Sequence, residues 1–208
     1  MRFEIRSGLV RVFAGLGVVA WAGAVVAGFG AIEAYEATPG PTAPASSGWP
    51  GGSALAFVPG RPNVVMALHP RCPCSRASLD ALAEIVGRTP GPVSVRLLIY
   101  RPVGSSPAWA SSRSRLIDGA DRVDDPGGAE AGRFGLATSG AVAAFDAGGR
   151  PRFSGGLTAG RGRSGPSDGG KALLAVLRSE EPGRRGSAVY GCGLGLEPGP
   201  AGPPGGGR

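Results

Sequence analysis

Reactive side chains gather in one short stretch of this sequence, residues 69–74, which reads His-Pro-Arg-Cys-Pro-Cys. It holds the only histidine, His69, and two of the three cysteines, Cys72 and Cys74. Two thiols separated by one residue can close a small disulfide ring, and a strained ring has a more oxidising potential than a relaxed one. Such a bond removes little chain entropy, so it suits exchange better than structural cross-linking. The spacing therefore predicts a redox-active Cys-x-Cys pair.

Cys72 is expected at the start of a helix. Pro73 suits the first helical position, which makes Cys72 the N-cap residue, beside free N–H groups and the positive end of the helix dipole. Arg71 and Arg76 add positive charge, so the pKa of Cys72 should fall below about 8.5. Cys74 lies inside the first turn, where the following side chains should partly cover it. Attack on a partner disulfide is therefore predicted to begin at Cys72.

A soft metal site is the competing interpretation of the same residues. His69, Cys72, Cys74 and Cys192 form a nitrogen and sulfur ligand set that suits Cu(I) or Zn. Against it, a one-residue separation is not the usual spacing of structural zinc knuckles. Three roles stay open for Cys192: a third redox thiol, a metal ligand or a buried thiol. For His69, a half-buried imidazole near a turn explains the residue as well as a catalytic role does.

Other chemistries find little support in the sequence. The net charge is +7, but the arginines are scattered and aromatic residues make up only 6%, which argues against nucleic-acid binding. The pattern G-x-G-x-x-G at 160–165 is expected by chance in so Gly-rich a chain, and Pro166 breaks the strand–turn–helix context that a phosphate loop needs. A Ser/His/acid triad is not credible, because the single histidine stands beside the two thiols.

The site must be positioned by the elements around it. Apolar runs next to Pro or Gly predict strands, and apolar residues spaced i, i+3, i+7 predict helices. In chain order the expected elements are a strand at Asn63–Leu68, a helix at Ser75–Val86, a strand at Val93–Tyr100, a hairpin at 141–145 and 150–154, and a helix at Gly170–Arg178 capped by Asp168. A strand–helix–strand opening favours parallel strands, and the hairpin makes the sheet mixed. The fold class is therefore α/β, with a mixed sheet and flanking helices.

The N-terminal segment Val12–Ile32 is 21 uncharged residues long, enough to cross a hydrocarbon layer of about 30 Å as a helix. Three arginines precede it, and Glu33 and Glu36 follow it, so the positive-inside rule places the N-terminus in the cytoplasm. A cleaved signal peptide is the alternative, although its apolar core is normally shorter. The sequence therefore predicts an uncleaved single-pass anchor.

Two stretches rich in Gly and Pro flank a central region, which has enough apolar residues to form one hydrophobic core. There are 39 Gly and 20 Pro residues in 208, a proportion typical of partly disordered chains. The predicted organisation is a cytoplasmic N-terminus at 1–11, a transmembrane helix at 12–32, a flexible linker at 33–53, a folded domain at 54–196 and a disordered tail at 197–208.

Strand, cysteine pair, helix and second strand in this order resemble the thioredoxin-like superfamily. The sequence further resembles the RedB family, single-span membrane proteins with a thioredoxin-like domain. The matching blocks are His69–Ser78, Arg133–Gly140, Phe153–Thr158 with Arg161-Gly162, and Tyr190-Gly-Cys192. The resemblance puts Cys72 and Cys74 at the redox positions. It puts Thr138-Ser-Gly140 where thioredoxins carry a cis-proline that shapes the substrate groove and keeps metals off the thiols, and no proline stands there.

The resulting hypothesis is a thiol–disulfide oxidoreductase anchored in the cell inner membrane, with its C-terminal thioredoxin-like domain in the periplasm. Its partner is a thiol-containing protein, Cys72 and Cys74 carry the exchange, and no cofactor is expected. Arg71, Pro73, Arg76 and Cys192 are the supporting residues. The alternative is a copper or zinc chaperone on the same fold, and a third candidate is an inactive interaction module.

Overall fold

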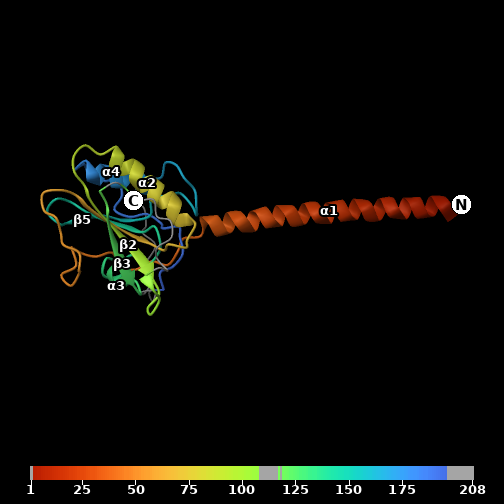
Figure 1. Cartoon of the computed structure of the whole chain (residues 1–208). Helices are drawn as coiled ribbons and strands as arrows, with labels where there is room; N and C mark the ends of the chain where they lie inside the picture. Colours follow the sequence, from red (N-terminus) through yellow and green to blue (C-terminus); the bar gives the residue numbers. More distant parts are fainter. Residues whose placement is uncertain (1, 108–116, 118, 196–208) are drawn as a thin grey trace. The chain divides into compact units, whose positions relative to one another are not determined.

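The computed structural model describes residues 2–107, 117 and 119–195 of the chain. The chain divides into an N-terminal helix, α1 (Arg2–Ala37), and a compact unit that begins at Thr38 (Figure 1). Within α1, the stretch Phe13–Ala37 is long and apolar enough to cross a membrane, by length and composition. A signal sequence near an N-terminus has the same properties, so the helix is a candidate span that contains most of the predicted one.

The compact unit is built on one mixed sheet of five strands. Its spatial order is β3-β2-β1-β4-β5, with β1 parallel to β2, β2 parallel to β3, and β4 antiparallel to both β1 and β5. The strands are β1 (Asn63–Leu68), β2 (Ser94–Arg101), β3 (Asp121–Pro126), β4 (Val142–Phe145) and β5 (Pro151–Gly155). The central strand β1 is buried along its whole length.

Both faces of the sheet are covered, and alternate residues of β1 serve the two faces because strand side chains point to opposite sides in turn. Val64, Met66 and Leu68 pack against α2 (Cys74–Gly87) and α4 (Asp168–Leu177). Val65 and Ala67 pack on the other face, with α3 (Ala129–Arg133) and the loops around it. Figure 1 shows α2 and α4 together on one side of the sheet and α3 on the other.

Strand β3 and helix α3 have no counterpart among the predicted elements. β3 reads Asp-Arg-Val-Asp-Asp-Pro and lacks the apolar pattern of a strand, because it forms the edge of the sheet. Ion pairs tie it to its neighbour: Arg96 Nε lies 3.3 Å from Asp121, and Arg101 Nε lies 2.7 Å from Asp124. The charged residues that make β3 unrecognisable as a strand by hydrophobicity thus also form the ion pairs that link it to β2.

Helix α4 starts two residues earlier than expected, and its cap is not Asp168. The side chain of Ser167 accepts a hydrogen bond of 3.0 Å from the Gly170 N–H, and Asp168 stands in the first turn. Hydroxyl and carboxylate side chains cap helices about equally well, so the sequence did not separate the two neighbours.

The predicted linker differs in its structure from a free tether. Helix α1 takes up its first residues, and 38–53 carry no helix or strand, but they belong to the compact unit. The Trp49 ring lies edge-on to Phe134 and Phe145, each with ring centroids 5.1 Å apart. One aromatic side chain therefore docks a segment whose average composition indicates disorder. The predicted tail at 197–208 lies outside the described residues.

The arrangement is a thioredoxin-like fold, as expected. A β1-α2-β2 crossover with parallel strands is followed by the antiparallel β4-β5 hairpin and α4, which packs beside α2. Strand β3 is an addition at the edge. In this topology the end of β1 and the start of α2 form one corner, and the cysteine pair stands at that corner.

Candidate functional site

Cys72 and Cys74 lie at the junction of β1 and α2. The turn that leads into the helix is closed by a 3.0 Å hydrogen bond from the Cys72 N–H to the His69 carbonyl. Helix α2 begins at Cys74, and Pro73, with φ −63° and ψ −29°, is its cap residue. The expected arrangement, with Cys72 as the cap, is therefore displaced by one residue. Cys72 still serves the helix start, because its carbonyl accepts the Ser75 N–H at 3.2 Å.

The third cysteine arrives at this corner from the C-terminal segment, residues 186–195. This segment makes isolated bridges, one of them between Thr138 and Gly193. The Ser139 N–H donates to the Cys192 carbonyl at 2.8 Å. The Cys192 side chain is thereby held in hydrogen-bonding contact with the thiol of Cys72. Tertiary structure thus brings together two cysteines that are far apart in the sequence.

Cys72 is the most acidic of the three thiols. Burial opposes ionisation of its sulfur, but hydrogen bonds from the Cys192 side chain and from the backbone N–H groups of Cys192 and Cys74 outweigh it and lower its pKa. Hydrogen bonds to the charged form favour that form. The lowered pKa agrees with the direction expected at a helix start, although neighbouring donors are its cause rather than Arg71 and Arg76.

Cys74 and Cys192 are kept protonated by the same arrangement. Burial, the negative charge of Cys72 and a hydrogen bond to its sulfur raise the pKa of Cys74. Burial and the same two interactions with Cys72 raise the pKa of Cys192 to about 11. Arg161 opposes both increases. At neutral pH one thiol is therefore poised to ionise between two that carry protons.

The order of exposure is the reverse of the prediction. Cys72 is buried, with 5% of its surface exposed, whereas Cys74 is half-exposed although it stands in the first turn of α2. The C-terminal segment explains the difference, because it covers Cys72 although it is distant from Cys72 in the sequence. The acidic thiol is the covered one.

Ser139 connects the segments that meet at the site. Its Oγ accepts the His69 N–H at 2.8 Å and lies 2.7 Å from the Ser75 Oγ, which donates to the His69 carbonyl at 3.0 Å. Ser139 stands where the resemblance places a cis-proline, and the described residues contain no cis peptide bond. The next residue, Gly140, has φ +90°, and a Cβ there would meet the Ser78 Oγ at 2.5 Å, so only glycine allows α2 this close.

The His69 side chain packs against Tyr100. Its ring stacks on Tyr100 with centroids 5.5 Å apart, and its Nδ1 accepts the Arg71 N–H at 3.2 Å. Burial and the charge of Arg71 lower the pKa of His69, which keeps the imidazole neutral. In the part of the chain that the structure describes, no three His, Cys, Asp or Glu side chains converge as metal ligands. The metal-ligand set His69, Cys72, Cys74 and Cys192 stays an alternative prediction.

Arg161 brings a positive charge to the thiols, and no sequence pattern had predicted this role. Its Nη1 donates to the Gly191 carbonyl at 2.6 Å, and its charge acts on both Cys74 and Cys192. The Gly162 N–H donates to the sulfur of Cys74. Arg161 and Gly162 belong to the G-x-G-x-x-G stretch at 160–165, which was rejected as a phosphate loop. The only sequence signal that included them was the resemblance to the RedB family. Arg76, by contrast, is exposed on α2.

Solved structures of proteins from several bacteria have a similar fold. A hypothetical protein of Sinorhizobium meliloti is 20% identical, with a TM-score of 0.53, over 79% of this chain and 94% of that one. An uncharacterized conserved protein of Geobacillus kaustophilus is 16% identical, with a TM-score of 0.51, over 79% of this chain and 92% of that one. These similarities concern the fold and assign no activity.

A weaker similarity links the chain to a secreted disulfide oxidoreductase of Mycobacterium tuberculosis, described as homologous to DsbE of E. coli. It is 19% identical, with a TM-score of 0.37, over 45% of this chain and 68% of that one. No protein-family model and no curated protein sequence matches the chain. The resemblance to the RedB family therefore stays a prediction.

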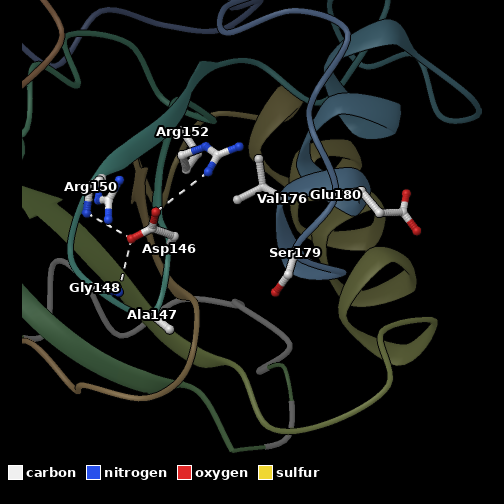
Figure 2. A pocket seen from close by; sticks show the side chains of 8 residues that line it. All are labelled: Asp146, Ala147, Gly148, Arg150, Arg152, Val176, Ser179 and Glu180. Atoms are coloured by element: carbon white, nitrogen blue, oxygen red, sulfur yellow. Dashed lines mark hydrogen bonds and ion pairs between the residues drawn. The ribbon is translucent and has the colours of Figure 1, made fainter.

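A shallow pocket of about 250 Å³ lies elsewhere, at the turn between β4 and β5 and the end of α4 (Figure 2). The Asp146 carboxylate accepts the N–H groups of Gly148 and Arg150, each at 3.0 Å, and lies 3.6 Å from Arg152. Burial opposes its ionisation, but these backbone donors and the two arginines lower the pKa of Asp146. Among the described residues, the buried Nε of Arg152 at this pocket has no hydrogen-bond partner, and no cysteine lines the pocket.

Proposed function

We propose that this chain is a thiol–disulfide oxidoreductase in which Cys72 is the attacking thiol and Cys74 the second thiol of the pair. The observation that carries the proposal is the ring of donors around Cys72. Its pKa is lowered despite burial, whereas the pKa of Cys74 is raised. A thiolate beside a protonated thiol is the arrangement that exchange requires, because the thiolate is the nucleophile.

The exchange conserves electrons without a cofactor. The Cys72 thiolate attacks one sulfur of a partner disulfide, a mixed disulfide forms, and the other partner sulfur leaves as a thiolate that takes up a proton. Cys74 then loses its proton and attacks the Cys72 sulfur, which releases the second partner thiol. The partner gains two electrons and the Cys72–Cys74 pair loses them. The reverse sequence oxidises a partner dithiol.

The proposed location is the periplasmic side of the inner membrane, with α1 as an uncleaved anchor. Its support is the apolar stretch of α1 and the arginine excess before it. An oxidising compartment is also where thiol exchange with disulfide-bonded proteins takes place. A reporter that is active only outside the cytoplasm, fused after Pro50, should be active. An inactive fusion at normal expression would overturn this location.

A trapping experiment tests the exchange itself. In the full chain, Cys74→Ser combined with Cys192→Ser should leave a reactive Cys72 that accumulates as a mixed disulfide with its partner, visible as a reducible higher-mass species, because no neighbouring thiol is left to release the partner. Cys72→Ser is the matched control and should trap nothing. Equal, slow reactivity of the two thiols towards iodoacetamide would instead identify an inactive interaction module on this fold.

A further inference from the structure

Cys72 stands between two candidate partners rather than one. The side chains of Cys74 and Cys192 each make a hydrogen bond with the Cys72 sulfur. All three cysteines are free thiols in this structure. Cys72 is therefore the common member of two pairs, Cys72–Cys74 within the local turn and Cys72–Cys192 across the fold.

The backbone around Cys192 is fixed on both sides of the residue. The Gly191 carbonyl accepts Arg161 Nη1 at 2.6 Å, the Cys192 carbonyl accepts the Ser139 N–H at 2.8 Å, and the Leu194 N–H donates to the Ala137 carbonyl at 2.9 Å.

Close packing adds to these hydrogen bonds. A Cβ on Gly191 would lie 2.0 Å from the Ser139 carbonyl oxygen, so glycine is needed for this approach. The C-terminal segment thus carries its thiol to Cys72 on a seated backbone rather than on a loose tail.

From this geometry we propose that Cys192 is a third redox thiol. It replaces Cys74 as the disulfide partner of Cys72, and the resulting long-range Cys72–Cys192 disulfide is the stable oxidised form. The inference rests on the proposed function, since that exchange first oxidises Cys72. The step is an isomerisation. Cys192 gives up its proton and attacks the Cys72 sulfur, the Cys72–Cys192 bond forms, the Cys72–Cys74 bond breaks, and the Cys74 thiolate takes up a proton. No further oxidant or reductant is consumed.

The two disulfides differ in what they constrain. A Cys-x-Cys ring is small and strained, and it removes almost no entropy from the unfolded chain. A bond between residues 72 and 192 closes a loop that contains most of the folded unit, so it restricts the unfolded chain far more. Within the folded chain the strain of the small ring decides, so the equilibrium between the two disulfides should favour Cys72–Cys192.

The charges at the site favour the same order of events. While Cys72 is a thiolate, burial, its hydrogen bond and its negative charge hold the proton on Cys192. Once Cys72 is part of a disulfide it no longer carries that charge, and the charge of Arg161 then favours ionisation of Cys192. Oxidation of Cys72 thus activates the thiol that attacks it.

Peptide mapping of the oxidised full chain in detergent tests the proposal. The chain is oxidised with glutathione disulfide, its free thiols are alkylated, and it is digested with trypsin, which places Cys72 and Cys74 on one peptide, 72–76, and Cys192 on another, 186–208. The expected product is peptide 72–76 cross-linked to 186–208 with the alkyl group on Cys74. An alkyl group on Cys192, or a cross-link through Cys74, would overturn the inference.

The outcomes separate this inference from the proposed function. A Cys72–Cys74 disulfide with alkylated Cys192 leaves the proposed function standing and removes the third thiol. Absence of any disulfide after oxidation removes both.

Two single variants make the result independent of mapping. Reduction should lower Tm by about 10 °C in the wild-type chain and in Cys74→Ser, but only slightly in Cys192→Ser. Equal Tm values for oxidised and reduced Cys74→Ser would contradict a Cys72–Cys192 bond.

Discussion

The two ends of strand β4 hold anionic groups by similar means and to different effect. At its N-terminal end, next to the end of β1, backbone N–H and thiol donors surround the Cys72 sulfur. At its C-terminal end, backbone N–H groups and arginines surround the Asp146 carboxylate (Figure 2). Donors lower the pKa at both sites against the effect of burial.

The difference lies in where the donors come from and what they can give up. The backbone and arginine partners of Asp146 all lie within six residues of it, and the arginines cannot be deprotonated. Those of Cys72 include a thiol from the other end of the folded unit, and thiols can lose a proton and form a bond to sulfur. Local, permanently charged partners make a structural turn, whereas distant, exchangeable partners make a site that can react.

The comparison predicts its largest effect at Cys72. Cys72→Ser should reduce the rate of disulfide exchange to background, because the serine hydroxyl is not an effective nucleophile towards sulfur. Asp146→Ala should leave this rate unchanged. The measurement is reduction of a model disulfide by the full chain, with far-UV circular dichroism to confirm folding. Loss of exchange in Asp146→Ala would break the comparison.

The next effect concerns stability at the thiol end of the sheet. Ser139→Ala removes the acceptor of the His69 N–H and the partner of Ser75, and it should lower the free energy of unfolding by about 2 kcal/mol. Urea unfolding measures the change. A cost below about 0.5 kcal/mol would show that water or another group replaces the hydroxyl.

A smaller effect tests the donors around the thiolate. With Cys74 replaced by Ser, alkylation of Cys72 by iodoacetamide should be half-maximal at a pH below about 8.5. Adding Cys192→Ala should raise that pH by about 1, since a hydrogen bond to the thiolate is lost. Cys192→Ser keeps a donor and is the matched control. The prediction fails if Ala and Ser at position 192 give the same profile.

The smallest effect is expected at the hairpin turn. Asp146→Ala should cost about 1 kcal/mol at pH 7, because two N–H donors and an ion pair lose their acceptor. The pKa of Asp146 is lowered in the folded state, so its contribution is complete above the unfolded value of about 3.9 and is lost as pH falls through the folded value.

The difference in urea midpoint between the wild-type chain and Asp146→Ala should therefore shrink as the pH is lowered from 7 through the folded-state pKa of Asp146. Asp80→Ala, at an exposed position on α2, is the control and should change stability by less than about 0.5 kcal/mol. A difference between wild type and Asp146→Ala that does not shrink at any acidic pH where the protein stays folded would show that the carboxylate charge contributes nothing.

The sequence by itself determined the elements whose signals are local. The apolar run predicted the bounds of β1, Asn63–Leu68, correctly. A central strand that is buried on both faces needs apolar residues along its whole length, and this pattern is visible in the sequence. The spacing of Leu79 and Leu82 located α2, and Gly-rich turn chemistry located the β4–β5 hairpin. From these the mixed sheet, and with it the corner that holds Cys72 and Cys74, could be derived.

Only the tertiary structure decided how that corner works. β3 was missed because ion pairs with arginine side chains of β2 hold it in the sheet. Trp49 packs against the domain and so holds a segment whose average composition predicts a flexible tether. Cys192 and Arg161 reach the site from segments that no periodicity connects to α2. Burial and hydrogen bonding of a thiol are set by whatever lies within a few ångströms, and sequence patterns report only neighbours along the chain. The position of Cys72 and Cys74 was therefore predictable, while their exposure and the contact of Cys192 with Cys72 were not.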